Sequence, residues 1–300
     1  VTVMAPLYSG GSVVMPKRFS ATDYWRLVAD NRCTWSSIVP TIIKYLLDRA
    51  EQEPFDFGSD ERLVEYRFAR SASAPLAAVT LQQWEQVFKI PMIETLGLTE
   101  TAGTVASNPL PPAPRKPGSV GLPYGNEIII VDDKGDECPP QVVGEIIIRG
   151  GNLLDLYYKN PQATSESIKD GWFYTGDLGR KDEEGYIFIT GRSKELIIRG
   201  GENIAPREID DVLYKHEAIL EAAAVGVDDE NYGQEVVACV VIRDGYQCSE
   251  DELKTFCEAG VGKYKAPKII YFFDDLPKGP SGKILRLQLP ELIAKSAAEK

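Results

Sequence analysis

The sequence predicts an α/β protein built from three consecutive parts, and changes in its pattern indicate where those parts meet. Over residues 1–112, apolar runs of strand length alternate with amphipathic segments of helical spacing, which favours a mostly parallel sheet covered by helices. A proline-dense connector at 108–117 leads into short strands separated by turns, typical of a small β-rich, barrel-like subdomain over 113–191. Alternation resumes over 192–300 and predicts a small α+β domain.

The first part is expected to alternate between helices and strands. Its opening residues read as a strand that runs into a turn, so we expect the chain to begin inside a domain. Ser20 can cap a helix over 21–31, and Thr41 begins a second helix with apolar residues at helical spacing. The remaining expected elements are a helix at 77–88 and strands at 11–15, 34–39, 66–69 and 90–96.

The second and third parts are expected to differ in their secondary structure. In the second part, three short strands are bounded by turn residues, and the expected ranges are 127–131, 145–149 and 186–190. In the third part, Pro206 stands at the favoured first position of a helix that we expect to reach His216. The other expected elements there are strands at 195–199, 219–226, 235–242 and 268–273 and helices at 250–258 and 286–296.

Composition excludes some classes of function. The net charge of −12 argues against duplex nucleic acid as a partner, although a small phosphorylated ligand needs only a local cation. No apolar run is long enough to span a membrane, and no signal peptide opens the chain. The five cysteines form no C-x-x-C pair, so we expect reduced thiols in a cytoplasmic protein rather than zinc ligands.

The segment PKGPSGKILR (277–286) places a lysine in a loop of the kind that cradles phosphates. It is not a P-loop, because Pro277 stands where the first glycine belongs and Ile284 where a hydroxyl residue belongs. A solvated lysine in a surface turn is the alternative reading of Lys283.

Two segments follow expected strands in the first part. In SASAPL (71–76), small side chains allow a flat ligand to approach the backbone, although a turn explains them equally. In ETLGLTET (94–101), a hydroxyl beside a carboxylate can bind a phosphate oxygen and magnesium together, and a helix N-cap is the alternative.

Two further segments lie near the expected junction with the last part. In DGWFYTGDLG (170–179), the two oxygens of Asp177 can accept both hydroxyls of a ribose, although a hairpin turn is an equal alternative. The segment GRSKELIIRGGENIAPREI (191–209) begins where the strand-rich texture ends.

Taken in order, these segments resemble the adenylate-forming (AMP-binding) superfamily, in the branch of the acyl-CoA synthetases. The most specific pieces are YTGDLG, GRSKELIIRGGENIAPREI and PKGPSGKILR. The resemblance implies the C-terminal part of the family's large N-domain, with an αβ layer and a barrel-like subdomain, followed by its mobile C-terminal domain. It also implies that the family's own phosphate loop precedes residue 1.

The resemblance implies an enzyme that activates a carboxylic acid with ATP and Mg²⁺ to an acyl-adenylate and then transfers the acyl group to CoA, in fatty-acid or aryl-acid metabolism. Loading of a carrier-protein pantetheine is the first alternative. The second is a catalytically incomplete fragment that binds nucleotide or CoA, and we expect the 300-residue chain alone to lack acid-dependent ATP–pyrophosphate exchange.

The resemblance also assigns residues to the nucleotide. Thr99 would hydrogen-bond the α-phosphate, Glu100 would hold magnesium, and Lys283 would be the lysine of the adenylation step. The residues expected around the adenosine are Ala74, Pro75, Thr95, Leu96, Asp177 and Arg192. Leu96 departs from the family, which usually has an aromatic residue there to stack on the adenine.

Other assignments concern the thiol, the acid and domain motion. Lys194 matches the hinge of the small domain, and the residues expected beside the thiol tunnel are Gly200, Gly201 and Glu202. The small residues Ala102, Gly103 and Thr104 are expected to border the acyl group and to leave room for a bulky or long one.

Overall fold

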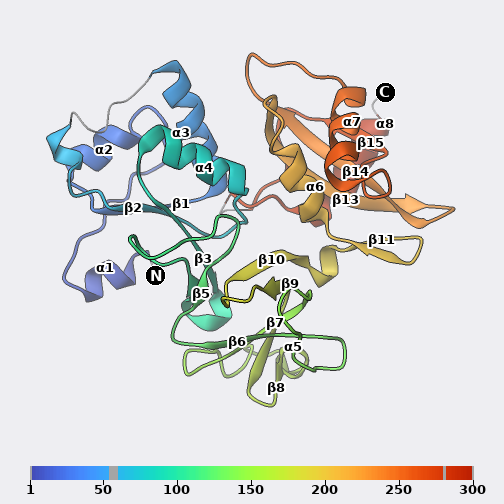
Figure 1. The fold of residues 1–300 in the computed structure, drawn as a ribbon, viewed down its shortest axis with the longest axis horizontal. Coiled ribbons are helices and arrows are strands. Elements are labelled where there is room, and N and C mark those ends of the chain that lie inside the picture. Colours follow the sequence, from blue (N-terminus) through green and yellow to red (C-terminus); the bar gives the residue numbers. More distant parts are fainter. Residues whose placement is uncertain (1, 54–59, 280–281, 299–300) are drawn as a thin grey trace. The chain divides into compact units, whose positions relative to one another are not determined.

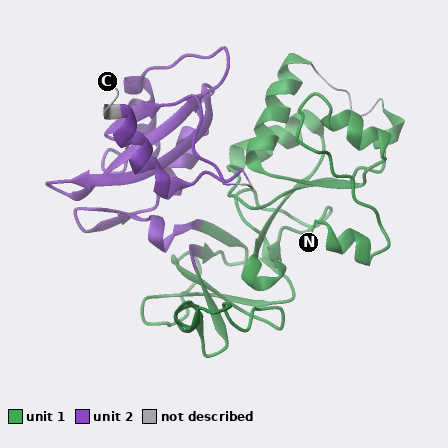
Figure 2. Ribbon diagram, turned by 180° about the vertical axis from the view of Figure 1, so that it is seen from behind, with its two compact units in different colours: residues 1–175, 180–189 green, residues 176–179, 190–300 purple. Residues whose placement is uncertain are grey.

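The computed structural model describes residues 2–53, 60–279 and 282–298. The chain is a mixed α/β protein, as expected, and it divides into two compact units. Unit 1 comprises residues 1–175 and 180–189, and unit 2 comprises residues 176–179 and 190–300 (Figure 2). The boundaries expected at 112/113 and 191/192 stay predictions.

The first sheet of unit 1 has the strand order β1-β2-β3-β4-β5. Its strands are β1 (Trp35–Ile38), β2 (Phe68–Ser71), β3 (Met92–Leu98), β4 (Gly103–Ser107) and β5 (Leu122–Pro123). The first three strands run parallel, whereas β4 and β5 are added antiparallel. Parallel strands that are joined through helices confirm the pattern expected for the first part.

Helices pack against this sheet through an aromatic-rich core. They are α2 (Tyr24–Asp30), α3 (Pro40–Gln52) and α4 (Ala78–Phe88), with a 3-10 turn η1 (Glu61–Leu63) (Figure 1). Pro40 occupies the first turn of α3, where its missing N–H costs no hydrogen bond. The Trp25 ring centroid lies 5.8 Å from that of Trp84 and 5.1 Å from that of Phe88. The buried face of these helices therefore fixes them on the sheet.

The opening of the chain differs from the expectation. A helix, α1 (Met4–Tyr8), stands where a strand was expected, because Met, Ala and Leu favour helix. The strand expected at 11–15 is also wrong. Those residues are mostly exposed and pair with no described strand, and an apolar run does not form a strand without a neighbour.

The second sheet of unit 1 is open rather than closed into a barrel. Its strands are β6 (Glu127–Val131), β7 (Gly144–Arg149), β8 (Ile168–Lys169), β9 (Trp172–Lys181) and β10 (Ile187–Arg192), and α5 (Pro161–Ser167) precedes β8. The order is β10-β9-β7-β6, with β8 beside β9. Buried isoleucines of β6 and β7 pack with Leu96 and Val105 of the first sheet and so form one core.

Unit 2 is built around a sheet that is buried on both faces. Its strands are β11 (Ile197–Arg199), β12 (Glu202–Ile204), β13 (Ile219–Asp229), β14 (Gly233–Ile242) and β15 (Ile269–Phe272), in the order β12-β11-β14-β13 with β15 beside β14. Its helices are α6 (Pro206–Leu213), α7 (Glu250–Val261) and α8 (Leu289–Ala298), with 3-10 turns η3 (Ser193–Glu195) and η4 (Arg286–Gln288).

The alternation along β13 and β14 explains this burial. Ala222 and Ala224 belong to the cluster that contains residues of α6 and α7, whereas Ala223 and Val225 belong to the cluster that contains residues of α8. The α+β texture expected for the third part is confirmed. Several element ends differ from the expected ranges; among them, α6 ends at Leu213 rather than His216, and Glu195 lies in η3 rather than in a strand.

Candidate active site

The expected site residues form two groups, one in each unit, and each group is described by itself. In unit 1, SASAPL follows the end of β2 and leads to α4. Ser73 has a φ of 72°, in the left-handed region that non-glycine residues rarely adopt. Ala74 is half-buried and Pro75 is exposed, so the backbone of this loop is accessible at the carboxyl end of the parallel strands.

Thr99 and Glu100 lie in the 3-10 turn η2 (Thr99–Thr101), directly after β3. The residue that caps this turn is Leu98, whose N–H donates to Thr101 Oγ1, so the N-cap alternative for Thr99 and Glu100 is wrong. The Thr99 side chain is exposed, and the Tyr157 hydroxyl donates to Glu100 Oε1 at 2.9 Å. Burial raises the pKa of Tyr157, and its bond to Glu100 adds to that rise, so the hydroxyl keeps its proton.

The magnesium assignment depends on Glu100 alone. Among residues 2–53, 60–279 and 282–298, no group of three or more His, Cys, Asp or Glu residues is placed to hold a metal ion. Magnesium often binds through one or two carboxylates together with the phosphates of a substrate. Glu100 Oε2, which is not part of the bond with Tyr157, fits that use.

The side chains of Thr95 and Leu96, which were expected to contact adenine, already make contacts within the protein. The side chain of Leu96 is only 7 % exposed and belongs to the core shared with β6 and β7. Thr95 is half-buried, and its hydroxyl donates to the Ser71 carbonyl at 3.4 Å. An aliphatic side chain at position 96 is thus used for packing, which accounts for the departure from an aromatic residue.

Ala102, Gly103 and Thr104 lead from η2 into β4. Ala102 is exposed, with a φ of 52°. Thr104 pairs with Gly97 of β3, where a Cβ atom would lie 2.5 Å from the Gly103 carbonyl oxygen. This close approach of the strands requires glycine at 97. The guanidinium of Arg70, in β2, donates to Thr104 Oγ1 at 3.1 Å.

Asp177 lies inside β9, in the short stretch 176–179 of that strand that belongs to unit 2, so the hairpin-turn alternative is wrong. Its carboxylate is buried, and Arg192 Nε lies 2.7 Å from Asp177 Oδ1. Burial raises the pKa of Asp177, whereas the charges of Arg192 and Lys283 oppose that rise. Arg192 itself is 43 % exposed, so the pair combines a buried acceptor with an accessible cation.

Lys283 is half-buried in the same unit, within electrostatic range of Asp177, Arg192 and Glu195. Burial lowers the pKa of the lysine, the positive charge of Arg192 lowers it further, and the two carboxylates oppose the shift. The turn around it is held by a bond from the Gly279 N–H to the Lys283 carbonyl at 2.9 Å. Pro280 and Ser281, in the middle of the segment PKGPSGKILR, lie outside the described residues. A solvated surface lysine does not describe this half-buried position.

Arg286 anchors the lysine-bearing segment to the unit. Its guanidinium lies 2.5 Å from Asp210 Oδ2 and 3.3 Å from Glu195 Oε2, and it donates to the Ala224 carbonyl. Asp210 is 6 % exposed and also accepts from the Ala224 N–H at 2.7 Å. A buried ion pair with further hydrogen bonds holds a fixed geometry.

Gly200 and Gly201 form the two-residue turn between β11 and β12. Arg199 pairs with Glu202 across that turn, and the glycines have φ values of 57° and 86°. Positive φ at both central positions is the requirement of a type I′ hairpin, which explains the glycines structurally. Glu202 is exposed, and so is Lys194 in η3, so both are accessible as the resemblance requires.

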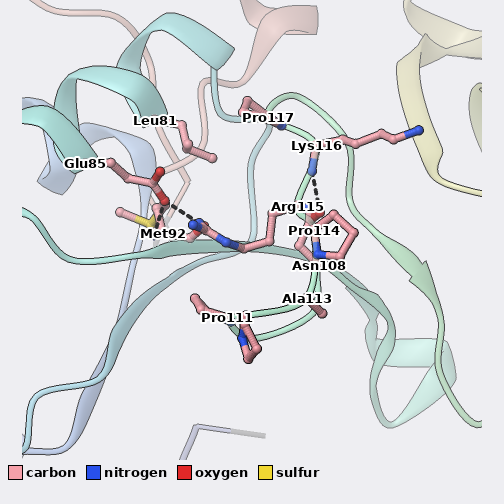
Figure 3. Close-up of a pocket in the computed structure, with 11 residues that line it drawn as sticks. Leu81, Glu85, Met92, Asn108, Pro111, Ala113, Pro114, Arg115, Lys116 and Pro117 are labelled. Atoms are coloured by element: carbon pink, nitrogen blue, oxygen red, sulfur yellow. Dashed lines mark hydrogen bonds and ion pairs between the residues drawn. The ribbon is translucent and has the colours of Figure 1, made fainter.

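A cavity of about 230 Å³ in unit 1 is lined by none of the expected site residues (Figure 3). The proline-rich connector lines it, together with side chains of α4 and β3. Its charged groups already have partners, because Arg115 pairs with Glu85 and donates to the Met92 carbonyl at 3.2 Å, and Lys116 pairs with Asp182 and Glu184. We therefore regard it as part of the packing of the connector.

Two residues of the unit 1 group were not expected from the sequence. Tyr157 follows Glu100 by 57 residues, and its role depends on tertiary contact. Arg70 is a strand residue three positions before Ser73, and no local pattern distinguishes it from a solvated arginine.

Two family models match the chain, one over its first half and one near its C-terminal end. A family model described as "AMP-binding enzyme" matches residues 1–158, which is more than half of the chain. A second model, described as "AMP-binding enzyme C-terminal domain", matches residues 208–283.

Curated relatives carry the names of CoA ligases. The chain is 50 % identical over 291 residues to a sulfoacetate–CoA ligase of Cupriavidus necator, a match that covers 96 % of the chain and 55 % of that protein. It is 42 % identical over 287 residues to an oxalate–CoA ligase of Arabidopsis thaliana, covering 95 % of the chain and 55 % of that protein. The chain spans about half the length of the curated relatives it matches.

Solved structures agree with the fold. An o-succinylbenzoate CoA synthetase from Bacillus subtilis, in complex with its acyl-adenylate intermediate, matches with a TM-score of 0.81 and 31 % identity. That match covers 95 % of this chain and 57 % of the solved chain. An anthranilate CoA ligase in complex with anthranoyl-AMP matches with a TM-score of 0.89 and 27 % identity, covering 99 % of this chain and 57 % of that one.

Proposed function

The chain belongs to the AMP-binding enzyme family, and from this premise we propose that the protein carrying it is an acid–CoA ligase. The reaction joins a carboxylic acid to CoA in two steps. A carboxylate oxygen of the acid first attacks the α-phosphorus of ATP, and pyrophosphate leaves. The CoA sulfur then attacks the carbonyl carbon of the acyl-adenylate, and AMP leaves.

The observation that carries this proposal is the position of Lys283 close to Asp177 and Arg192. In the first step a carboxylate approaches an anionic phosphate, so two negative charges meet. A positioned ammonium group offsets that repulsion in the transition state. Lys283 is held in a half-buried position by the segment that Arg286 anchors, where its charge is screened less than it is in water.

We assign the remaining nucleotide contacts by position. Asp177 accepts the ribose hydroxyls, with Arg192 as a second contact, and Thr99 donates to the α-phosphate. Glu100 supplies the carboxylate for Mg²⁺, which neutralises phosphate charge when it is bound. The backbone of Ala74, Pro75, Thr95 and Leu96 borders the adenine.

The second step uses other residues of unit 2 in this proposal. Gly200, Gly201 and Glu202 border the pantetheine arm of CoA, and Lys194 is the hinge that brings this turn to the acyl-adenylate. The sharp turn at the glycines gives the arm an accessible backbone edge without side chains. We place the reaction in the cytoplasm. No helix in the described residues is long and apolar enough to cross a membrane.

The names of the relatives do not identify the acid, because they specify chemically different acids. The proposal is tested with the natural protein that carries these residues, by acid-dependent exchange of pyrophosphate into ATP and by formation of an acyl-CoA. We expect exchange without CoA, and thioester only when acid, ATP, Mg²⁺ and CoA are all present. Thioester formation without any acid-dependent exchange would contradict the adenylate route.

A further inference from the structure

Arg70 is a charged residue in the interior of a parallel sheet. It stands opposite Ser37 of β1 and Ile93 of β3. Paired residues of parallel strands point to the same face, so Ser37, Arg70 and Ile93 share one face of the sheet. The guanidinium donates to Ser37 Oγ of β1 at 3.2 Å and to Thr104 Oγ1 of β4 at 3.1 Å, so it bridges these two strands.

The charge of Arg70 has no carboxylate to balance it. No Asp or Glu among the described residues lies within 4.0 Å of its guanidinium, and its hydrogen bonds go to two hydroxyl oxygens. Other partly buried arginines do have such a partner: Arg115 pairs with Glu85, Arg199 with Glu235 and Arg286 with Asp210.

The partial burial of the Arg70 charge without a counter-charge costs solvation free energy. Arg70 is half-buried, and burial lowers the pKa of its guanidinium from the ordinary value. A guanidinium nevertheless stays protonated at neutral pH, so the sheet carries a permanent positive charge that has lost part of its water. An anion that binds there gains more from the charge than it would at the surface.

The position of the charge relates it to the acid. Thr104, which accepts from Arg70, is one of the three residues expected beside the acyl group. Its partner across the strands is Gly97, and Gly103 precedes it, so the neighbouring positions carry little or no side chain. The end of the acid that is remote from the reacting carboxylate would therefore meet Thr104 and Arg70.

We propose that Arg70 selects the acid, and that the substrate carries a second anionic group, a carboxylate or a sulfonate, which binds the Arg70 guanidinium. The inference rests on the proposed function and specifies its substrate class. A planar guanidinium offers two parallel N–H donors to two anionic oxygens, a geometry that carboxylate and sulfonate share. A long apolar acyl group, which the small residues 102–104 suggested, would leave this charge unbalanced.

A purely structural Arg70 is the competing explanation, in which it only ties β1 to β4 through two hydroxyls. The two explanations differ in what the charge does for different acids. A structural arginine affects all acids alike, whereas a substrate-binding arginine affects only acids with a second anion.

The experiment measures kcat/KM for matched pairs of acids with the natural protein that carries this chain. The pairs are malonate against propionate and sulfoacetate against methylsulfonylacetate, scored by acid-dependent pyrophosphate release. The readout is the ratio within each pair, because a ratio on one protein sample does not depend on how much of it is folded. The variants are Arg70→Met, Arg70→Lys and, as a control, Arg67→Met, which removes an exposed positive charge three residues away.

We expect the wild type to prefer the dianion of at least one pair, and the better pair distinguishes a carboxylate from a sulfonate. Arg70→Met should lower that ratio by about 30-fold or more, since removing one partner of a desolvated charge pair has effects of that size. Arg70→Lys should keep part of the ratio, because the charge remains but the two-pronged geometry is lost. Arg67→Met should leave it unchanged.

Three results would overturn the inference. A wild type that prefers the monoanion in both pairs would do so, as would an Arg70→Met variant in which kcat/KM falls equally for the dianion and the monoanion. Either of those leaves the acid–CoA ligase assignment standing. No acid-dependent pyrophosphate release by the wild type with any acid contradicts the proposed function itself, and the inference falls with it.

Discussion

Arg286 in unit 2 and Arg70 in unit 1 are both partly removed from water, but their charges are balanced differently. Arg286 lies against Asp210 and Glu195 and donates to a backbone carbonyl. Arg70 lies against two hydroxyl groups and no described carboxylate. The first arrangement is complete within the protein, whereas the second lacks a counter-charge.

This difference distinguishes arginines that stabilise the fold through ion pairs from an arginine that is available to bind an anionic ligand. Breaking a buried pair leaves its partner charged and unpaired, which is costly. Removing a cation that has no carboxylate partner leaves no such orphan. The two regions should therefore respond in opposite ways to the same substitution, and the predictions below test that contrast.

The largest effect is expected at the lysine that Arg286 helps to hold. Lys283→Ala should lower acid-dependent ATP–pyrophosphate exchange by about 10³-fold, because the charge that offsets repulsion between carboxylate and phosphate is lost. Formation of the thioester from preformed acyl-adenylate and CoA should survive. The matched control is Lys295→Ala, an exposed lysine of α8. Equal loss of both half-reactions would refute the role given to Lys283.

The next effect concerns the balanced arginine itself. Arg286→Met should lower the free energy of unfolding by about 3–5 kcal/mol, because it leaves Asp210 buried without its cation. Urea denaturation followed by circular dichroism measures this loss. The double variant Arg286→Met/Asp210→Leu should recover part of it, and no recovery would argue that the guanidinium does not act through Asp210.

A smaller effect is expected in the pH dependence of nucleotide binding. In the proposed site Asp177 binds ribose as a carboxylate, so affinity should be present above its pKa and lost as pH falls through that pKa. Burial raises this pKa and Arg192 opposes the rise, so Arg192→Met should move the midpoint of the loss to higher pH. Calorimetric titration with AMP across the acid range measures the midpoint, and a midpoint that stays put or falls would contradict the assignment.

The smallest effect is expected at the turn beside Arg199, another arginine balanced by a carboxylate. Gly200→Ala should lower the free energy of unfolding by about 1 kcal/mol, because an alanine is strained in the left-handed region. The new methyl would also lie 3.3 Å from the Tyr264 hydroxyl oxygen. Denaturation with Gly201→Ala as comparison measures the difference, since the space around Gly201 is open. No loss in either variant would argue against the type I′ turn.

The sequence predicted the elements whose pattern is local. The strands β1 to β3 and the helices α3 and α4 follow from apolar spacing, because the apolar residues that form the buried face of each element lie within about a dozen consecutive residues. The strand expected at 11–15 failed, because an apolar run also needs a neighbouring strand and those residues have none in the described chain. The second sheet was expected to be barrel-like, but whether a sheet closes depends on how its edge strands meet.

The site was predicted unevenly for a related reason. Asp177 and Lys283 stand in segments with a recognisable local order of residues, so a resemblance could assign them to the candidate site. Arg70 and Tyr157 carry no local signal, since their partners Thr104 and Glu100 lie 34 and 57 residues away in the chain. Only the register of the strands shows that Arg70 has hydroxyls rather than carboxylates around it.

The contrast between the two arginines is tested most directly by the free energy of unfolding of Arg70→Met, measured beside the wild type in the same urea titration. The account predicts a value within about 1 kcal/mol of the wild type or above it, because the substitution removes a partly desolvated cation and two bonds to hydroxyls. A loss of about 3 kcal/mol or more, of the size expected for Arg286→Met, would show that Arg70 is a structural residue and would contradict the account.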